Sequence, residues 1–258
     1  SVQYNQKLLK FDVIFNVIHG TPGEDGLLQA YFQLLGLKQT SCDFYQAALT
    51  FNKRDLLSVL KPYGIKTAKS YYLNLGDVIA TDKIIAQVGL PCFVKPNRSG
   101  SSFGISKVHT LDELLPAIKT AYKEDNEIII ESFLKGTEVS VGVLNYQGEV
   151  IVLPMTEIVS ENDFFDYEAK YLGKSQEITP ARISEEIKVK VEEAAKKAYK
   201  VLQMKGFSRS EFIIVDGEPF MLEMNTIPGM TNESILPQQA KAAGITMKDL
   251  LTNAIEQA

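Results

Sequence analysis

The sequence has few of the residues that build zinc sites and disulfide frameworks. Its 258 residues include no tryptophan, two histidines and two cysteines, Cys42 and Cys92. Two cysteines so far apart indicate neither a disulfide framework nor a zinc site, and they are typical of the reducing cytoplasm. A metal site in this chain has to rest on carboxylate and carbonyl oxygens, and the ions that prefer such ligands are Mg²⁺ and Mn²⁺.

Long apolar runs and basic tracts are also missing. No uninterrupted apolar run is long enough to span a bilayer, and the first ten residues lack the apolar segment of a signal peptide. The chain has 27 basic and 32 acidic residues, a net charge of −5. A mildly acidic protein without a basic tract is a poor ligand for nucleic acid. We therefore expect a cytoplasmic protein that binds neither membranes nor nucleic acid.

Segments typical of strands and helices alternate along most of the chain, which predicts a mixed α/β fold. We expect strands at 11–17, 91–95, 105–108, 127–132, 138–145, 149–154, 212–215 and 219–224. We expect helices at 24–35, 43–60, 111–122, 183–201, 235–243 and 247–256, and hairpin turns at Gln147-Gly148 and Asp216-Gly217.

The segment 157–179 is rich in charged and aromatic residues and has no clear period, so we expect a long loop. Long loops inside compact chains tend to be lids or binding loops. A lid that brings Lys170 and Tyr171 over a phosphate is one interpretation of this segment. A solvated charged loop is the other.

The pattern Glu223-Met224-Asn225 is the sharpest local feature. Residues two apart on a strand point to the same face, so Glu223 and Asn225 present two oxygen ligands together. If the strands pair around the Asp216-Gly217 turn, Glu211 falls close to Glu223. Two carboxylates and an amide oxygen suit a divalent metal bound to phosphate oxygens. From the residues alone, an exposed hairpin with scattered charges is the alternative.

A loop of small residues, 98–104, follows the predicted strand that ends at Lys95. Glycine and serine let backbone N–H groups approach an anion closely, and Lys95 adds a positive charge for phosphate. The loop matches neither the G-x-x-x-x-G-K-[ST] nor the G-x-G-x-x-G pattern, and a flexible hairpin connection is the alternative. His19 follows a strand, where a lone histidine is more often a structural hydrogen-bonding group than a catalyst.

Four segments in this order resemble the D-alanine–D-alanine ligases, which are ATP-grasp enzymes. They are HGTPGEDG at 19–26, VKPNRSGSSFG at 94–104, DYEAKY at 166–171 and LEMNTIPGMTNES at 222–234. The resemblance runs from about Phe11 to the C-terminus. It implies a remainder of an N-terminal α/β substrate domain (1–41), a central ATP-grasp subdomain (42–131), and a C-terminal subdomain (132–258) with a lid at 157–179.

The resemblance also implies residue roles. It assigns nucleotide binding to Lys53, Lys95, Ser102, Glu131, Phe133, Leu134, Glu138 and Lys170. Within this set, Lys53 and Lys95 hold the ATP phosphates, 131–134 meets adenine, and Glu138 binds the ribose. It assigns two Mg²⁺ or Mn²⁺ ions to Glu211, Glu223 and Asn225, and an oxyanion hole to Arg209 and the Gly229 backbone. It places His19, Glu24 and the Ser101–Tyr171 pair near the first D-alanine and Ser234 near the second.

The implied function is ATP-dependent ligation of two D-alanines through an acyl phosphate, for peptidoglycan precursors, by a homodimer. Two features depart from the family. Glu211 stands where many relatives carry Asp, which keeps the charge on a longer stem. No segment matches the family's first strand–loop–helix region, so we expect either that this region precedes the residues given or that the protein is a shortened relative.

Three alternatives remain open from the sequence. Two are sister ligases that make D-alanyl-D-lactate or D-alanyl-D-serine, although the lid pair Lys170-Tyr171 resembles the dipeptide-forming type. The third is a nucleotide-binding protein that is catalytically silent because its first subsite is incomplete.

Overall fold

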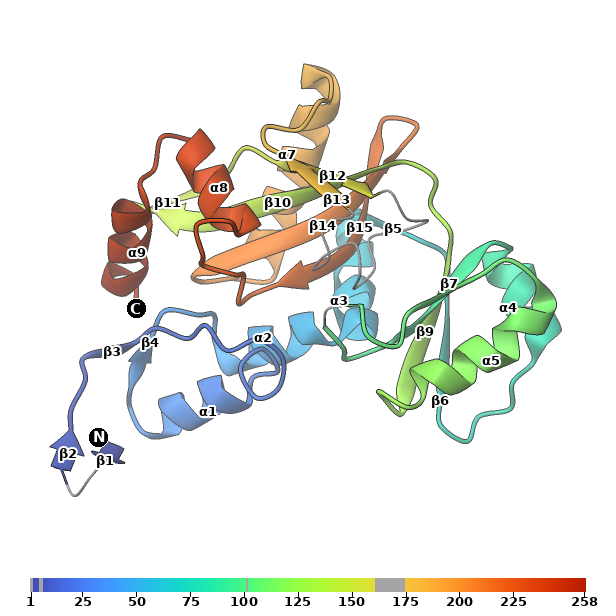
Figure 1. Cartoon of the computed structure of the whole chain (residues 1–258), viewed down its shortest axis with the longest axis horizontal. Helices are drawn as coiled ribbons and strands as arrows, with labels where there is room; N and C mark the ends of the chain where they lie inside the picture. Colours follow the sequence, from blue (N-terminus) through green and yellow to red (C-terminus); the bar gives the residue numbers. More distant parts are fainter. Residues whose placement is uncertain (1, 5–6, 101, 161–174) are drawn as a thin grey trace.

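Two separate β-sheets organise the chain in the computed structural model, which describes residues 2–4, 7–100, 102–160 and 175–258. The larger sheet occupies the middle of the molecule and the smaller one lies at one end (Figure 1). The expected mixed α/β fold is confirmed. No helix in the described ranges is long and apolar enough to cross a bilayer.

The large sheet consists of seven strands. They are β5 (Lys66–Thr67), β10 (Thr137–Tyr146), β11 (Glu149–Val152), β12 (Thr156–Ser160), β13 (Ser175–Ile178), β14 (Phe207–Val215) and β15 (Glu218–Asn225). Their order is β13-β12-β10-β14-β15-β5, with β11 also paired to β10, and only the β15–β5 pair is parallel. The expected turns of the two hairpins are confirmed, because Gln147, Gly148, Asp216 and Gly217 all have positive φ.

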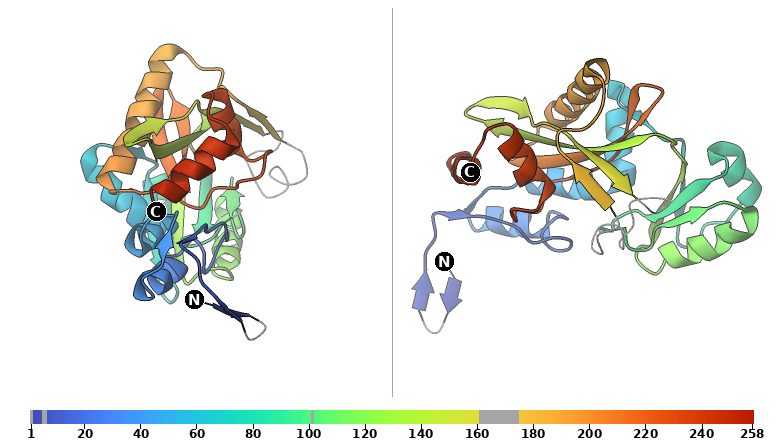
Figure 2. Two further views of the ribbon diagram at one scale, coloured as in Figure 1. Left: turned by 90° about the vertical axis from the view of Figure 1, so that its left-hand side faces the viewer. Right: turned by 45° about the horizontal axis from the view of Figure 1, so that its top comes forward.

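Helices cover both faces of this sheet (Figures 1 and 2). One face packs against α2 (Phe44–Phe51), α3 (Lys53–Leu60) and α7 (Glu185–Val201) around a buried core that includes Leu56, Tyr199 and Phe212. The other face packs against α8 (Ile235–Ala242) and α9 (Met247–Glu256) through Leu236 and Leu250.

The small sheet is antiparallel, with the order β6-β9-β7-β8. Its strands are β6 (Ser70–Asn74), β7 (Cys92–Pro96), β8 (Ser106–Val108) and β9 (Glu127–Ser132). Helices α4 (Thr81–Val88) and α5 (Leu111–Ala121) close its own core, in which Val94, Leu114 and Ile128 are fully buried. Each sheet therefore has a separate hydrophobic core.

The first forty residues contain short elements only. They are β1 (Val2–Tyr4), β2 (Lys7–Leu9), β3 (Val13–Ile14), α1 (Leu27–Leu34) and β4 (Lys38–Gln39). The expected buried strand at 11–17 is wrong in extent. In the described part of the chain β3 pairs only with the two residues of β4, and Phe11 and Val17 beyond it are exposed.

The expected helix at 43–60 is two helices, because Asn52 adopts an extended conformation with φ −87° and ψ 102°. Its side chain accepts a hydrogen bond from the Asp55 amide at 3.0 Å and so caps α3. An asparagine stabilises a helix start better than a helix interior, which explains the break. The 3-10 turn η1 (Lys61–Tyr63) then ends this helix before Gly64.

The expected long loop at 157–179 is also wrong where the structure describes it. Strands β12 and β13 pair here, with Glu157 opposite Ile178 and Ser160 opposite Ser175. Strand β12 pairs with β10 on one side and with β13 on the other, and β-branched Thr156, Ile158 and Val159 suit such a strand. The DYEAKY segment at 166–171 lies outside the described residues.

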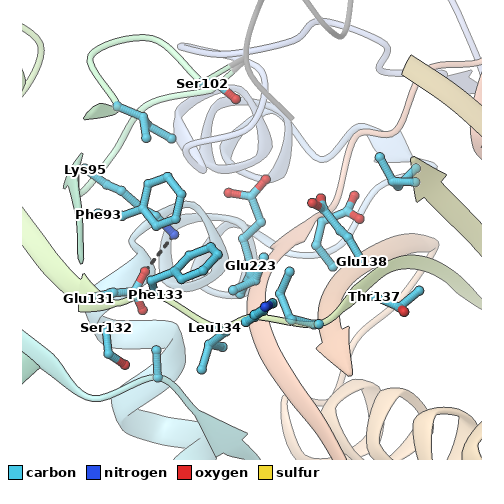
Figure 3. A pocket seen from close by; sticks show the side chains of 18 of the residues that line it. Phe93, Lys95, Ser102, Glu131, Ser132, Phe133, Leu134, Thr137, Glu138 and Glu223 are labelled. Carbon is cyan, nitrogen blue, oxygen red and sulfur yellow. Dashed lines mark hydrogen bonds and ion pairs between the residues drawn. The ribbon is translucent and has the colours of Figure 1, made fainter. Parts of the chain in front are cut away.

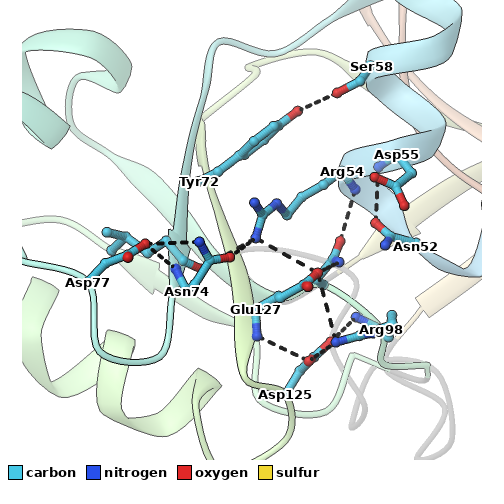
Figure 4. Close-up of polar contacts among 12 residues, drawn as sticks. Asn52, Arg54, Asp55, Ser58, Tyr72, Asn74, Asp77, Arg98, Asp125 and Glu127 are labelled. Carbon is cyan, nitrogen blue, oxygen red and sulfur yellow. Dashed lines mark hydrogen bonds and ion pairs between the residues drawn. The ribbon is translucent and has the colours of Figure 1, made fainter.

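An ion pair fixes the start of the 98–104 loop. Arg98 donates from Nε and Nη2 to the Asp125 carboxylate at 3.0 and 2.8 Å, and its backbone amide donates at 2.7 Å (Figure 4). Burial opposes the charge on Asp125, but the hydrogen bonds from Arg98 and from the Glu127 amide outweigh it and lower the pKa of this carboxyl.

We expect Asp125→Asn to lower the free energy of unfolding by about 1 kcal/mol at pH 7, since Arg98 is partly exposed to solvent. Because the pKa of Asp125 is lower in the folded state, its ionised form stabilises the fold above the usual aspartate pKa. This contribution disappears as the pH falls through the folded-state value. Urea unfolding between pH 7 and pH 3 tests this. The difference between wild type and variant should shrink below about pH 4, and a constant difference would contradict the assignment.

Candidate active site

A cavity of about 440 Å³ lies between the two sheets. It is lined from the small sheet by β7 and β9, from the large sheet by β10, β12, β14 and β15, and from α3 by its first residue (Figure 3). Nine of the residues predicted for the site line this cavity. They are Lys53, Lys95, Ser102, Glu131, Phe133, Leu134, Glu138, Glu211 and Glu223.

Two carboxylates face each other on the large sheet. Glu211 of β14 lies directly opposite Glu223 of β15, so the expectation that these two carboxylates lie close together is confirmed. The register then shifts, because Phe212 pairs with Met221 and leaves Leu222 as an extra residue, a β-bulge. The bulge explains why both Met221 and Met224 are buried in the core while Leu222 and Glu223 both line the cavity.

Two lysines bring positive charge to the same cavity. Lys53 is buried, its Nζ lies 3.3 Å from Glu223 Oε2, and it donates a hydrogen bond to the Ser99 carbonyl at 2.9 Å. Lys95 Nζ donates to Glu131 Oε2 at 2.8 Å (Figure 3). Burial opposes the charge on Lys95, but the Glu131 carboxylate outweighs burial and raises the pKa of this lysine.

One end of the cavity is apolar and aromatic. The rings of Phe93 and Phe133 lie 6.1 Å apart between centroids, and Lys107 Nζ lies 4.4 Å from the Phe133 centroid. Leu134 and Leu222 also line this cavity. Sequence reasoning missed Phe93 and Leu222. Phe93 carried a usable signal, because it lies two residues before Lys95 on the same strand and so shares its face.

The remaining predicted residues of the large sheet lie outside the cavity lining, near the ends of the same strands. Arg209 pairs in register with Asn225, and its Nε lies 3.0 Å from Glu211 Oε1. Asn225 Oδ1 accepts a hydrogen bond from the Ile227 amide at 2.8 Å. Arg209 and Asn225 therefore flank the two carboxylates on one side.

Gly229 and Ser234 approach each other beyond the end of β15. A Cβ atom at Gly229 would lie 2.6 Å from Ser234 Oγ, so the contact requires glycine. Ser234 Oγ also accepts a hydrogen bond from the Thr231 amide at 3.2 Å. Both residues lie in the segment 226–234, which connects the strand that carries Glu223 to the start of α8.

The 19–26 motif forms a tight turn around a buried carboxylate. Glu24 Oε2 accepts a hydrogen bond from the Gly20 amide at 2.6 Å. Burial raises the pKa of Glu24, although the Gly20 hydrogen bond and the adjacent His19 act in the opposite direction. The nearby charges of Glu223 and Arg209 also act on the pKa of Glu24, so this motif lies near the large-sheet residues of the site. His19 itself is exposed.

Three predicted residues, Ser101, Lys170 and Tyr171, lie outside the described residues. Among the residues that the structure does describe, no cluster of three or more His, Cys, Asp or Glu side chains has the spacing of a metal site. The expected metal ligands include only two residues of these types, Glu211 and Glu223, because the third ligand is an asparagine. A metal site here therefore rests on the Glu211–Glu223 pair.

Comparisons with known proteins identify the family. The family model described as "D-ala D-ala ligase C-terminus" matches residues 59–256. A D-alanine–D-alanine ligase of Flavobacterium johnsoniae is 75% identical over 99% of this chain and 79% of its own length. One from Phocaeicola vulgatus is 46% identical over 99% of this chain and 79% of its own length.

Solved structures agree with the sequence relatives. The VanG D-Ala:D-Ser ligase of Enterococcus faecalis has a TM-score of 0.89 and 38% identity, covering 97% of this chain and 74% of the other. A D-alanine–D-alanine ligase of Bacillus anthracis complexed with ATP has a TM-score of 0.83 and 29% identity, covering 95% of this chain and 78% of the other. The fold is thus that of the ATP-grasp ligases, and the chain belongs to the D-alanine–D-alanine ligase family.

The Lys95–Glu131 pair generates a stability prediction. Both side chains are almost fully buried, so loss of one partner leaves an uncompensated charge. We expect Lys95→Met or Glu131→Gln alone to lower the free energy of unfolding by about 3 kcal/mol, and the double variant to lose much less than the sum. Urea denaturation of all four proteins measures this. Additive losses would show that the two groups do not stabilise each other.

Proposed function

We propose that the protein ligates two D-alanines to D-alanyl-D-alanine at the expense of ATP, through an acyl phosphate, for peptidoglycan precursor synthesis. The observation that carries this proposal is the 75% identity over nearly the whole chain to a relative named D-alanine–D-alanine ligase. The cavity supports it, since Lys95 of the small sheet lines it together with Lys53 of α3 and with Glu211 and Glu223 of the large sheet.

Each part of ATP can be matched to residues that line this cavity. The aromatic end with Phe93, Phe133 and Leu134 suits adenine, because a flat apolar ring gains most from aromatic and aliphatic neighbours. Glu138 also lines the cavity, and we assign its carboxylate to the ribose hydroxyls. Lys53 and Lys95 supply positive charge for the phosphates, and Ser102 lines the same cavity.

The donor set also fits the magnesium or manganese ions that the family implies. Glu211 and Glu223 lie opposite each other and both face the cavity, while Asn225 is two residues beyond Glu223. Without a divalent ion, Arg209 and Lys53 balance these carboxylates. The bound ions would neutralise the charge of the polyphosphate. Their hard, oxygen-preferring character matches two carboxylates and an amide.

The chain's own groups then explain the ligation. A carboxylate is a poor electrophile, so ATP first converts the carboxylate of one D-alanine to an acyl phosphate. The amine of the second D-alanine attacks this carbonyl, and phosphate leaves. We assign stabilisation of the developing oxyanion to Arg209 and the backbone N–H at Gly229, a contribution that typically amounts to about 3–4 kcal/mol per donor.

The substrate side of the site rests on the family resemblance. We assign His19, Glu24, Ser101 and Tyr171 to the first D-alanine, Ser234 to the carboxylate of the second, and Lys170 to the nucleotide. Homodimer formation, a cytoplasmic location and the division into 1–41, 42–131 and 132–258 belong to the same proposal.

Phosphate release tests the function. We expect D-alanine to stimulate release of phosphate from ATP, with D-alanyl-D-alanine as the product detected by mass spectrometry, and L-alanine to leave the rate at background. Because VanG is named a D-Ala:D-Ser ligase, D-serine and D-lactate are offered with D-alanine as competing second substrates. Equal stimulation by L-alanine would refute the proposal. ATP binding without D-alanine-stimulated release would favour a silent nucleotide-binding protein.

The metal assignment has its own test. We expect Glu223→Gln to abolish ligation, about a thousandfold loss or more, and to weaken Mn²⁺ binding to the nucleotide complex in paramagnetic resonance titrations. Glu218→Gln is the matched control, since Glu218 is on the same strand but pairs with Lys66 and Lys190 outside the cavity. Turnover by Glu223→Gln equal to that of the control would exclude Glu223 as a ligand.

A further inference from the structure

Asn97, the residue after β7, joins the small sheet to helix α3 of the large-sheet core. It is fully buried and uses all of its polar groups. Its backbone amide and its Nδ2 donate to Glu127, at 2.9 Å to the carbonyl and 2.8 Å to Oε2. Its own backbone carbonyl and Oδ1 accept hydrogen bonds from the start of α3. Asn97 belongs to the segment 94–104 that resembles the family, but the resemblance assigns this residue no role.

The contacts with α3 act as a helix cap supplied from another part of the chain. The amides of the first turn of a helix have no partner within the helix. The Lys53 amide donates to the Asn97 carbonyl at 3.3 Å, and the Arg54 amide donates to Asn97 Oδ1 at 2.9 Å. The third amide, that of Asp55, is satisfied locally by Asn52. Two residues, Asn52 and Asn97, therefore divide the capping of one helix.

This cap ties together the two lysines of the cavity. Lys53 is the first residue of α3, and Lys95 lies two residues before Asn97 on β7. The Lys53 amide thus makes one of the Asn97 hydrogen bonds itself and Lys95 is two residues from Asn97, although one lysine is on a helix and the other on a strand with a different core. The Lys53 ammonium also donates to Ser99, two residues after Asn97, which carries the link into the 98–104 loop.

Side-chain contacts of Arg54 also connect the start of α3 to the small sheet. Its guanidinium lies 4.7 Å from the Tyr72 ring centroid and donates to Asn74 Oδ1 at 2.9 Å (Figure 4). It also lies 3.9 Å from Glu127 Oε2, the group that receives the hydrogen bond of Asn97. The first turn of α3 is therefore fixed to β6, β7 and β9 at once.

We propose that Asn97 is a positioning residue, which sets the separation of Lys53 and Lys95 so that both reach one polyphosphate. The inference rests on the proposed function only in that the phosphates of ATP bind between these lysines. A purely structural role is the alternative, in which Asn97 stabilises α3 like any other cap. The two roles differ in which part of the nucleotide they affect.

Isothermal titration of ATP and of adenosine, with magnesium and without D-alanine, separates the two roles. We expect Asn97→Ala to weaken ATP binding about tenfold and to leave adenosine binding within about twofold, because adenosine carries no phosphate. Asn52→Ala is the matched control. It removes the other cap of the same helix without detaching it from β7, and should leave both affinities within about twofold.

A double variant that exchanges the amide and the carboxylate of Asn97 and Glu127 keeps the test informative if Asn97→Ala does not fold. Asn97→Asp alone places two carboxylates together and should weaken ATP binding. Adding Glu127→Gln reverses donor and acceptor across the 2.8 Å hydrogen bond, keeps an acceptor for the Arg54 amide, and should restore ATP affinity to within about threefold of wild type.

The inference is overturned if folded Asn97→Ala binds ATP like wild type, or if it loses ATP and adenosine equally. It is also overturned if Asn52→Ala has the same effect on ATP, if the reciprocal exchange fails to rescue binding, or if wild type binds ATP no more tightly than adenosine. These outcomes are separate from failure of the proposed function, because a protein that binds ATP but does not ligate D-alanine still gives a clear result for Asn97.

Discussion

The antiparallel pairing of β14 with β15 is the constraint on which the site depends. It places Glu211 opposite Glu223, and Arg209 opposite Asn225, so that four polar residues meet on two strands joined by a tight turn. The bulge at Leu222 then changes which face of the sheet the following side chains of β15 point to. Without the extra residue, Glu223 would share a face with the buried Met221, and a carboxylate would point into the hydrophobic core. The local irregularity is therefore what brings the second carboxylate to the cavity.

The small sheet, which has its own core, supplies one of the two positive charges of the cavity. Lys95 comes from this sheet and Lys53 from a helix packed on the large one, so their separation depends on the joint between the two. Glu131 and Glu223 balance the lysines in the structure described here. An arriving polyphosphate would exchange these internal partners for its own negative charge. This exchange favours a ligand that offers several anionic oxygens together.

Much of this arrangement follows from sequence, and the parts that do not have physical reasons. The Asp216-Gly217 turn predicts that Glu211 lies close to Glu223, but a regular two-residue hairpin pairs Glu211 with Leu222. The bulge shifts the partner of Glu211 to Glu223, and the apolar run 220–222 does not show which residue is the extra one. The break at Asn52 is hidden because apolar residues continue at helical spacing on both sides of it. Strands β12 and β13 form by pairing with each other and with β10, and the residues of 157–179 have no hydrophobic period that marks this pairing.

The central claim is that a carboxylate is activated by phosphorylation in this cavity, and the fate of one oxygen atom tests it most directly. D-alanine whose carboxylate carries a heavy oxygen isotope is incubated with ATP, magnesium and the protein, and the released phosphate is examined by mass spectrometry. If an acyl phosphate forms and the amine of the second D-alanine attacks its carbonyl, the phosphate leaves with one labelled oxygen from the substrate. Phosphate released during D-alanine-dependent turnover without the label would contradict the account, because its oxygen would then come from water.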